Sequence, residues 1–593
     1  MEHGQYLRFL RPYLFQLPSS KATVYARLFS AGRYHPVKVR NSQCLGFQST
    51  SRRVLHASTA KRFTSSDSKP SVENTVALSS RQVTIDKRVQ KLKEYDALHY
   101  PRLGPRPNRM SIPSFRDKYR DAKTVSSTEE VVLEGRVLSV RRSGSKLVFF
   151  NIMGEQRQVQ VMVSLSQLSD PALEPRHFKD ALHPFLRGDI VSVKGVATRT
   201  EAGELTLQAT ELPTILSPGV APLPEMLVDQ ETMVLNRHVD YLVNDRAVDT
   251  LRVRSRILKC MRDFFYERDF IEVQTPILAD HAGGAIARPF VTSATELPRK
   301  ELALRIAPEL WLKRLVVGGN DKVFEIGPAF RNEGIDTGHN PEFTMCEFYS
   351  AYSNLSDLIS MTEGLMTRVF NDPYDAMFPG LRSLEQTRIK LPTESWKQVE
   401  FIPALEEILG IKFPDLSDPN SLPTLIKLAE EVAKITPGPT PTMAKILDEL
   451  ASKYLEKDSA ESPLFIIHHP ACMSPLSKSF TCPKTGQLVS ARAELFIRGR
   501  EIANMYEEEN DPFEQRRKFQ LQVESKNGNL AADNEIDESY VQALEYGLPP
   551  TGGWGCGIDR LVMLLSGAPR IGDVLSFGTL KNVVSIRQAA KDS

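Results

Sequence analysis

Between residues 131 and 215, apolar residues recur at every second position in a series of short runs, which is the period of a β-strand with one buried face. The apolar positions of three of these runs are Val159, Val161 and Val163; Val191, Val193 and Val196; and Leu205, Leu207 and Ala209. Turn residues such as Ala202-Gly203 separate the runs. Short strands at this spacing predict a small closed barrel of five strands.

Further along the chain, the apolar positions change to the spacing of an amphipathic helix. They are Val253, Ile257, Leu258, Met261, Phe264 and Phe265, and basic residues occupy the opposite face. The segment that follows, Phe270–Pro276, predicts a strand. We therefore expect a helix and then a strand near the start of a second, larger unit.

Two strand-like runs, residues 322–326 and 343–349, enclose a loop that contains an arginine, a carboxylate and a histidine. Such a hairpin can direct Arg331 at a phosphate, place Glu333 against an exocyclic amine and stack Phe343 on a base. This combination predicts an ATP site built on an antiparallel sheet, not on a glycine-rich phosphate loop. The alternative interpretation is a charged hairpin on the protein surface.

Composition limits the class of protein. A chain of 593 residues is too long for one core, so two or three domains are expected. The net charge of only +2 means that any contact with nucleic acid must be local. No apolar run is long enough to span a bilayer, so no membrane contact is expected.

The six cysteines form no C-x-x-C pair, which favours a reducing compartment. A zinc site is not expected, because the spacing of the candidate ligands His468, His469, Cys472 and Cys482 is irregular.

The first 66 residues differ from the rest of the chain. They contain eleven Lys or Arg residues, many hydroxyl side chains and a single acid, Glu2. This composition is typical of a mitochondrial transit peptide, which is removed after import. A disordered basic arm that binds RNA is the alternative. In either case the segment is left out of the predicted fold.

The remaining chain divides into three predicted parts. Residues 67–125 form an N-terminal helical extension that includes a short basic helix over residues 89–98. Residues 126–217 form the barrel, and residues 218–593 form the larger unit. Within that unit, residues 376–460 have a leucine-rich helical pattern with several prolines, which predicts a helical insertion.

A third motif lies near the C-terminus. Four glycines within six residues are followed by an arginine at the start of a helical pattern: Gly552, Gly553, Gly555, Gly557 and Arg560. Glycines at this density let the backbone approach a ligand closely. Together with the helix–strand ending at Pro276 and the Arg331 hairpin, they give three motifs in an order that resembles the class II aminoacyl-tRNA synthetases. The resemblance is closest to lysyl-tRNA synthetases of the mitochondrial type and covers about residues 85 to 585.

The resemblance implies an α+β fold, in which a class II antiparallel sheet flanked by helices is preceded by an all-β OB-fold barrel. It implies a lysine–tRNA ligase that uses ATP to convert L-lysine to lysyl-adenylate and then transfers the lysyl group to the 3′ end of tRNA(Lys). It further implies a homodimer formed through the first motif and, with the N-terminal composition, a location in the mitochondrial matrix.

The resemblance also implies roles for particular residues. Arg331 and Arg560 match the catalytic arginines that bind the α- and γ-phosphates of a bent ATP. The implied ATP-binding residues are Arg331, Glu333, His339, Asn340, Phe343, Glu494 and Arg560. Glu494 and Glu501 match carboxylates that hold Mg²⁺, a hard cation that prefers oxygen ligands shared with phosphate. Two solvated acids on a strand are the alternative.

The implied lysine-binding residues are Gly284, Glu309, Glu347, Tyr349, Asn504 and Glu508, with Gly284 at the α-amino end of the substrate. Buried carboxylates are costly unless a cation pairs with them, so this pocket is expected to prefer an ammonium group on a long stem. A basic side chain of the protein itself inside the pocket would argue against that interpretation.

In the barrel, the resemblance implies an anticodon reader. Phe149 and Gln160 match stacking and hydrogen-bonding positions, and Glu204 matches the carboxylate that reads the central uracil. Three basic residues lie beside Phe149 and Phe150 in the sequence: Arg141, Arg142 and Lys146. Cations next to aromatic rings agree with binding of single-stranded RNA. An aromatic core next to a solvated basic turn is the alternative.

Two other functions stay open on sequence grounds. An aspartyl or asparaginyl synthetase shares this architecture, but it tends to place a cation in the amino-acid pocket. A synthetase-like RNA-binding paralogue usually lacks an ATP arginine or a metal carboxylate, whereas both arginines and both carboxylates are present here. Trp554 and Cys556 replace the smaller residues usual between the third-motif glycines, which puts local packing in doubt.

Overall fold

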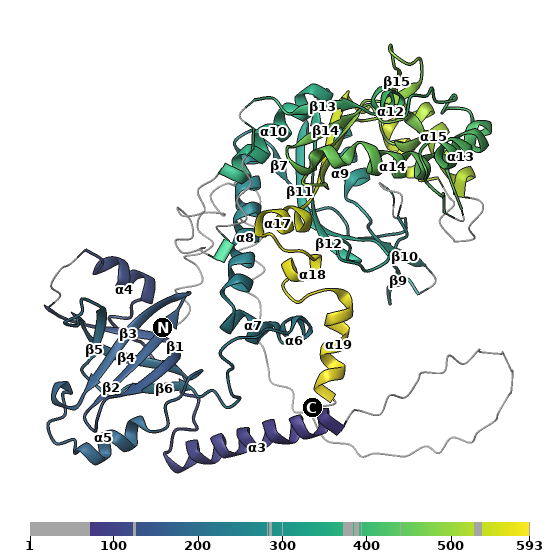
Figure 1. Cartoon of the computed structure of the whole chain (residues 1–593). Helices are drawn as coiled ribbons and strands as arrows, with labels where there is room; N and C mark the ends of the chain where they lie inside the picture. Colours follow the sequence, from purple (N-terminus) through teal and green to yellow (C-terminus); the bar gives the residue numbers. More distant parts are fainter. Residues whose placement is uncertain are drawn as a thin grey trace, which may run out of the picture. The chain divides into compact units, whose positions relative to one another are not determined.

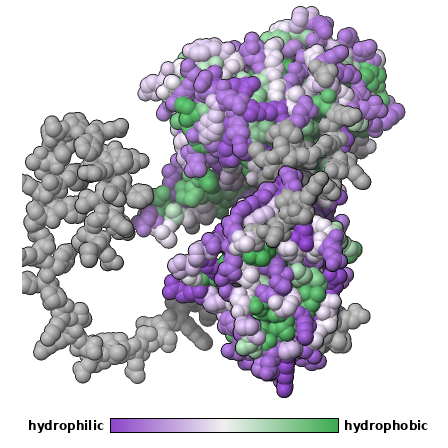
Figure 2. Space-filling view, turned by 90° about the vertical axis from the view of Figure 1, so that its left-hand side faces the viewer, coloured by the Kyte–Doolittle hydropathy of each residue, from purple (hydrophilic) through white to green (hydrophobic). Residues whose placement is uncertain are grey.

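The computed structural model describes residues 72–121, 126–281, 283, 287–298, 300–371, 383–384, 391–392, 394–438, 440–526 and 536–591 (Figure 1). The expected transit peptide lies outside these residues. Among the described residues, no helix combines the length and apolar character needed to cross a membrane. The face in Figure 2 is mainly hydrophilic, with hydrophobic areas scattered across it.

The alternating segment forms the predicted barrel. Its strands are β1 (Ser126–Arg142), β2 (Leu147–Gly154), β3 (Arg157–Ser164), β4 (Ile190–Arg199), β5 (Leu205–Ala209) and β6 (Thr214–Ser217). The order β1-β2-β3-β5-β4 closes because β1 also pairs with β4, and β6 adds to β4. The valines of the predicted runs lie in its core, except Val196, which is half-buried while its neighbour Ala197 takes the core position. Closure leaves no free edge among the five barrel strands, which confirms the prediction.

The N-terminal helix differs from its prediction. It is α3 (Val72–Glu94). This helix begins before the predicted start at residue 89 and ends before the predicted end at residue 98. Asp96 adopts a left-handed backbone conformation, with φ of 48°, and this turn ends the helix. Its last turns attach to the barrel, since Leu92 joins the barrel core and Arg88 donates to Asp189 at 2.8 Å. Two shorter helices, α4 (Ile112–Lys118) and α5 (Pro175–Leu182), also pack on this core.

The larger unit is built on one eight-stranded sheet in the order β13-β14-β17-β18-β19-β12-β11-β7. The strands are β7 (Ile271–Glu272), β11 (Lys322–Phe330), β12 (Glu342–Ala351), β13 (Lys397–Glu400), β14 (Leu464–Ile467), β17 (Arg492–Ile497), β18 (Arg500–Glu507) and β19 (Thr551–Gly557). All neighbours are antiparallel except the two outermost pairs, β13–β14 and β11–β7. The predicted antiparallel sheet is confirmed.

Alternation along β12 divides this sheet into two faces. Cys346 and Phe348 belong to the main core, which they share with helices α8 (Asp245–Tyr266), α10 (Leu355–Asn371) and α17 (Ile558–Ser566). The intervening Glu347 and Tyr349 point to the opposite face. There Tyr349 packs with α9 (Glu309–Val317) and α16 (Glu538–Leu544). The candidate site lies on this second face.

The segment predicted as a helical insertion forms helices α12 (Phe401–Leu409), α13 (Leu422–Glu431) and α14 (Met443–Tyr454) around a separate hydrophobic core. One part of that segment is not helical. Residues Lys397–Glu400 form β13, which extends the central sheet by pairing with β14. Tertiary pairing at the sheet edge therefore overrides the helical pattern there.

Short elements complete the larger unit. They are α6 (Gln230–Leu235), α7 (Arg237–Val243), α15 (Pro512–Lys526), α18 (Ile571–Val574), α19 (Leu580–Lys591), a small sheet of β8 (Leu278–Ala279), β9 (Val291–Ser293) and β10 (Glu301–Leu304), and a hairpin of β15 (Ser479–Thr481) and β16 (Leu488–Ser490).

Candidate active site

The predicted hairpin is formed by β11 and β12, whose register pairs Phe330 with Glu342 at the open end. Arg331 is the first residue of the loop, and its backbone N–H donates to the Pro341 carbonyl at 2.8 Å. The Arg331 guanidinium lies 5.2 Å from the centre of the Phe343 ring. The structure therefore brings together the arginine and the aromatic ring that were assigned to phosphate and base.

Arg305 holds the strand that leads to Arg331. Its buried guanidinium donates to Glu325 at 2.6 Å, to the Thr275 hydroxyl at 2.8 Å and to the Pro328 carbonyl at 2.9 Å. The Arg305 carbonyl accepts from the N–H of Phe330 at 3.0 Å. Sequence reasoning gave Arg305 no role. A buried pair with this many bonds fixes the end of the first motif against the hairpin.

His339, Arg560 and Glu501 converge from separate elements. Arg560, at the start of α17, lies 3.1 Å from His339 Nε2 of the hairpin loop and 2.9 Å from a carboxylate oxygen of Glu501 on β18. His339 Nδ1 lies 2.8 Å from Asp336. These side chains are partly exposed, so a ligand can reach them. We call His339, Arg560, Glu494 and Glu501 the phosphate side of the site.

Two other loop residues have different surroundings. The Glu333 side chain is exposed. Asn340 is buried, and its amide donates to the Glu342 carbonyl at 2.6 Å and accepts from the N–H of Leu580 at 3.1 Å. The Asn340 side chain thus holds the hairpin loop against the start of α19. The predicted contact between Asn340 and ATP stays a prediction.

The third motif lies between the two halves of the site, because β19 pairs with β12 on one side and β18 on the other. A Cβ at Gly553 would collide with the Glu508 carboxylate and come within 2.7 Å of the Tyr349 ring. At Gly555 the nearest atom would be 3.6 Å away, which is ordinary contact. Gly553 therefore makes room for two of the predicted lysine-binding side chains.

Glu494 and Glu501 lie on the neighbouring strands β17 and β18. Burial opposes the charge on Glu494, but Arg492 and His469 lower its pKa to about 2. His469 Nε2 is 3.2 Å from Glu494, and the Arg492 guanidinium contacts its other oxygen. Both carboxylates also raise the pKa of Glu456 of the insertion, whose own burial contributes most to its value of about 7. The Glu494 carboxylate is therefore ionised at neutral pH.

The predicted lysine-binding residues gather on the sheet face opposite the main core. Glu309 opens α9, Glu347 and Tyr349 lie on β12, and Glu508 follows β18; all four side chains are buried. Asn504 on β18 accepts from Arg492 at 3.0 Å. Gly284 lies outside the described residues. We call Glu309, Glu347, Tyr349 and Glu508 the amino-acid pocket.

Sequence reasoning missed a cation inside this pocket. Lys313, one turn along α9 from Glu309, is completely buried, with its Nζ 2.6 Å from Glu309 and in contact with Glu508. Tyr506 donates to the same Glu309 oxygen at 2.7 Å. Lys313 is the basic side chain of the protein whose presence would argue against a pocket that waits for an external ammonium, and for Glu309 and Glu508 that expectation was wrong. The i,i+4 spacing of Glu309 and Lys313 was the available signal.

Glu347 differs from the other two carboxylates. Its described partner is the Tyr349 hydroxyl, at 3.3 Å. Burial, followed by the negative charge of Glu309, raises the pKa of Glu347 to about 8. An arriving cation would favour the ionised form of Glu347, so this part of the pocket still suits a cationic ligand.

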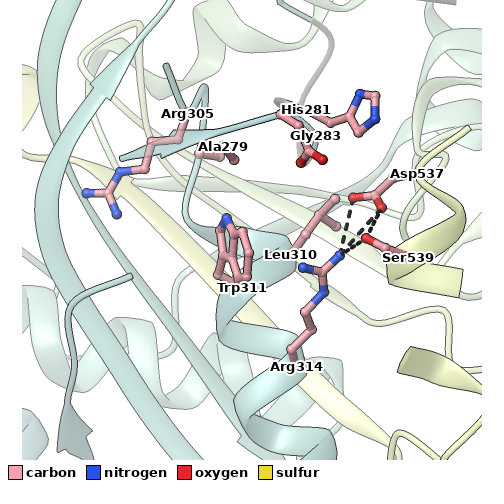
Figure 3. Close-up of a pocket in the computed structure, with 11 residues that line it drawn as sticks. Ala279, His281, Gly283, Arg305, Leu310, Trp311, Arg314, Asp537 and Ser539 are labelled. Atoms are coloured by element: carbon pink, nitrogen blue, oxygen red, sulfur yellow. Dashed lines mark hydrogen bonds and ion pairs between the residues drawn. The ribbon is translucent and has the colours of Figure 1, made fainter. Parts of the chain in front are cut away.

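A pocket adjoins this region on the far side of α9 (Figure 3). It is lined by Ala279, Asp280, His281, Gly283, Arg305, Ala307, Leu310, Trp311, Arg314, Asp537 and Ser539. Figure 3 shows Arg314 pointing toward α16, where it donates to the Ser539 hydroxyl at 2.7 Å. This contact connects α9 with the start of α16, so both helices that enclose the amino-acid pocket are tied together.

In the barrel, Phe149 and Gln160 lie on the neighbouring strands β2 and β3. Arg141 lies 4.7 Å from the centre of the Phe149 ring, and Gln160 is buried and donates to the Thr206 hydroxyl at 3.0 Å. Glu204 is exposed, just before β5, which pairs with β3. The three predicted anticodon residues thus lie on β2, on β3 and beside β5, in a contiguous part of the barrel sheet.

Comparison with known families gives the same division of the chain. Residues 229–581 match the tRNA synthetases class II (D, K and N). This chain belongs to that family. Residues 131–215 match the OB-fold nucleic acid binding domain of tRNA anticodon binding. The class II synthetase sheet and its preceding barrel are therefore both identified independently of the site geometry.

Similar class II synthetases include enzymes from fungi and bacteria. The mitochondrial lysine–tRNA ligase of Schizosaccharomyces pombe is 40% identical over 516 residues, which cover 86% of this chain and 95% of that protein. The mitochondrial lysine–tRNA ligase of Saccharomyces cerevisiae is 38% identical over 480 residues, 76% and 82% of the two chains. The lysine–tRNA ligase of Listeria monocytogenes is 38% identical over 475 residues, 79% and 90%.

Proposed function

We propose that this class II synthetase is a lysine–tRNA ligase. The observation that carries the proposal is the amino-acid pocket, in which one internal cation, Lys313, pairs with Glu309 and Glu508 while the Tyr349 hydroxyl is the described partner of the buried Glu347. A substrate with two ammonium groups supplies the missing positive charge, whereas the acidic side chain of aspartate would add to the repulsion. The names of the similar enzymes support the same amino acid.

In the first step, the carboxylate of lysine attacks the α-phosphorus of ATP, and pyrophosphate leaves with the electron pair of the broken P–O bond. Arg331 is the residue that meets the charge on the α-phosphate, and Arg560, with His339 beside it, binds the terminal phosphates. Catalysis is then orientation plus electrostatic stabilisation, without a protein nucleophile.

Mg²⁺ fits the phosphate side. Glu494 is held ionised, and Glu501 is partly exposed on the next strand, so two hard carboxylate ligands are available. Two protein ligands suit a cation that arrives with phosphate oxygens and water. Bound there, Mg²⁺ would neutralise phosphate charge, while Glu494 and Glu501 fix its position relative to Arg560.

In the second step, the 3′-hydroxyl of the terminal adenosine of tRNA(Lys) attacks the carbonyl of the adenylate, and AMP leaves. The barrel, residues 126–217, binds the anticodon through Phe149, Gln160 and Glu204, while residues 218–593 carry out catalysis and 376–460 form an insertion. Replacing the exposed Glu204 by Gln is expected to leave adenylate formation unchanged and to lower tRNA charging about tenfold. Glu201→Gln, in the same turn, is the control.

The enzyme is proposed to act as a homodimer in the mitochondrial matrix. Apolar side chains are exposed in the first motif, at Ile271, and directly after it, at Ile277 and Leu278, which supports a subunit interface there. The basic, acid-poor first 66 residues and the mitochondrial relatives support import.

The test is amino-acid-dependent ATP–pyrophosphate exchange by the chain that lacks its first 66 residues. Exchange is expected with lysine and not with aspartate or asparagine. Exchange that depends on another amino acid would overturn the lysine assignment, and no exchange with any amino acid would favour a non-enzymatic RNA-binding role.

A further inference from the structure

Lys313 is the most deeply buried cation in the part of the chain that the structure describes, with no exposed surface. The groups that face it come from four elements. They are Glu309 of α9, Tyr349 and Glu347 of β12, Tyr506 and Glu508 at the end of β18, and Tyr540 of α16. Three of these are tyrosine rings whose centres lie 5.8–5.9 Å from the Lys313 ammonium.

The pairs formed by Lys313 fix two carboxylates in the pocket. Glu309 is held between the Lys313 ammonium at 2.6 Å and the Tyr506 hydroxyl at 2.7 Å. Glu508 contacts the same ammonium while its side chain lies against the backbone of Gly553. Neither carboxylate is free to turn away, since the ammonium and the rings enclose them.

Without Lys313, the buried acidic side chains of Glu309, Glu347 and Glu508 would lie close together with no internal cation. Burial raises the pKa of Glu508 well above its usual range, and the Lys313 ammonium opposes that rise. Removing the ammonium would therefore favour the neutral form of Glu508 further. It would also remove the group that fixes the direction of the Glu309 and Glu508 side chains.

We propose that Lys313 is a positioning residue of the amino-acid site: its ammonium holds the carboxyl groups of Glu309 and Glu508 in the orientation that receives the cationic groups of lysine. This inference rests on the proposed function and adds a residue to it. Lys313 itself touches the protein carboxylates, so it acts on the substrate through them.

The test compares Lys313→Met, which keeps the size of the side chain and removes its charge, with the wild-type protein in lysine-dependent pyrophosphate exchange. The KM for lysine is expected to rise at least tenfold at pH 7, while the KM for ATP and kcat change less than threefold. Because higher pH favours the ionised form of Glu508, whose pKa the Lys313 ammonium lowers, the increase in KM is expected to shrink by pH 9 relative to wild type. Lys313→Arg keeps the charge and is expected to recover part of the loss.

The matched control is Arg88→Met. Arg88 is also a buried cation, and it pairs with Asp189 at 2.8 Å and with the Pro184 carbonyl at 2.6 Å, neither of which belongs to the amino-acid pocket. This variant is expected to lower the melting temperature without changing the KM for lysine. If Lys313→Met does not fold, Lys313→Gln is measured by the same criteria.

An unchanged KM for lysine in Lys313→Met, or a parallel decrease of kcat with all KM values constant at every pH, would overturn the positioning role. Wild-type exchange that requires an amino acid other than lysine would overturn the proposed function itself. The two failures are therefore distinguishable in one set of assays.

Discussion

The two halves of the active site differ in how far their charged side chains are exposed to solvent. In the amino-acid pocket, Lys313 and Glu508 are completely buried and paired with each other. On the phosphate side, the Arg560–Glu501 pair leaves 32% and 39% of its side chains exposed, and His339 is 54% exposed. Buried pairs keep their geometry because separating them leaves a desolvated charge, whereas exposed pairs rearrange at little cost.

The difference matches the chemistry proposed for each half. A pocket that must select one amino acid needs fixed charges, and specificity then comes from the penalty for leaving them unpaired. A site that must admit ATP and release pyrophosphate needs side chains that can change partners. Arg560 can leave Glu501 for a phosphate, which frees Glu501 at the same moment. The predictions below separate the two halves, starting with the variant that is expected to have the largest effect.

Arg331→Ala is expected to have the largest effect, since Arg331 is the proposed partner of the α-phosphate, where the reaction takes place. Loss of a preorganised charged donor to the reacting phosphate predicts a decrease in lysine-dependent exchange of about 1000-fold. The melting temperature is expected to stay within a few degrees of wild type, because Arg331 is only partly buried. Exchange at the wild-type rate would contradict its role.

Glu494→Gln tests the phosphate side alone. Removing one of two carboxylates is expected to lower exchange about 100-fold and to raise the Mg²⁺ concentration needed for half-maximal activity. The KM for lysine should remain near its wild-type value. Asp458→Asn, which alters an exposed pair with Lys397 in the insertion, is the control. A change confined to the KM for lysine would reverse our assignment of the two halves.

Gly553→Ala tests the amino-acid pocket alone. The added methyl must displace the Glu508 carboxylate, so the KM for lysine is expected to rise about tenfold or more. Gly555→Ala is the matched variant two residues away, where the methyl finds ordinary contact at 3.6 Å. It is expected to change the KM for lysine less than threefold. Equal effects of both variants would show that the change in the KM for lysine comes from distortion of the sheet and not from displacement of Glu508.

The smallest predicted effect is a pH dependence that comes from Glu347. Its pKa of about 8 means that it is largely protonated at pH 7, and an arriving ammonium favours the ionised form. Lysine binding should therefore release a proton, and the KM for lysine should fall as pH rises toward 8, by at most about tenfold per pH unit. Calorimetry in buffers of different ionisation enthalpy measures the proton. Glu347→Gln should remove this dependence.

Local patterns were enough to predict much of the molecule. Alternation between residues 131 and 215 predicted the barrel because a closed sheet buries every second side chain. The same rule places Glu347 and Tyr349 on the face opposite Phe348, which positions two of the predicted pocket residues. The hairpin at Arg331 and the third-motif glycines lie within single supersecondary units, so sequence spacing fixes their geometry.

The sequence by itself determined which residues carry charge at the site and which strands and helices present them. Only the tertiary structure decided which charges meet. Arg305 binds Glu325 and Thr275, Asn340 reaches Leu580, and Lys313 turns toward Glu508, all through contacts between residues distant in the chain. The physical reason is that the cost of a buried charge depends on every group around it, and those groups are assembled only when α9, β12, β18 and α16 pack together.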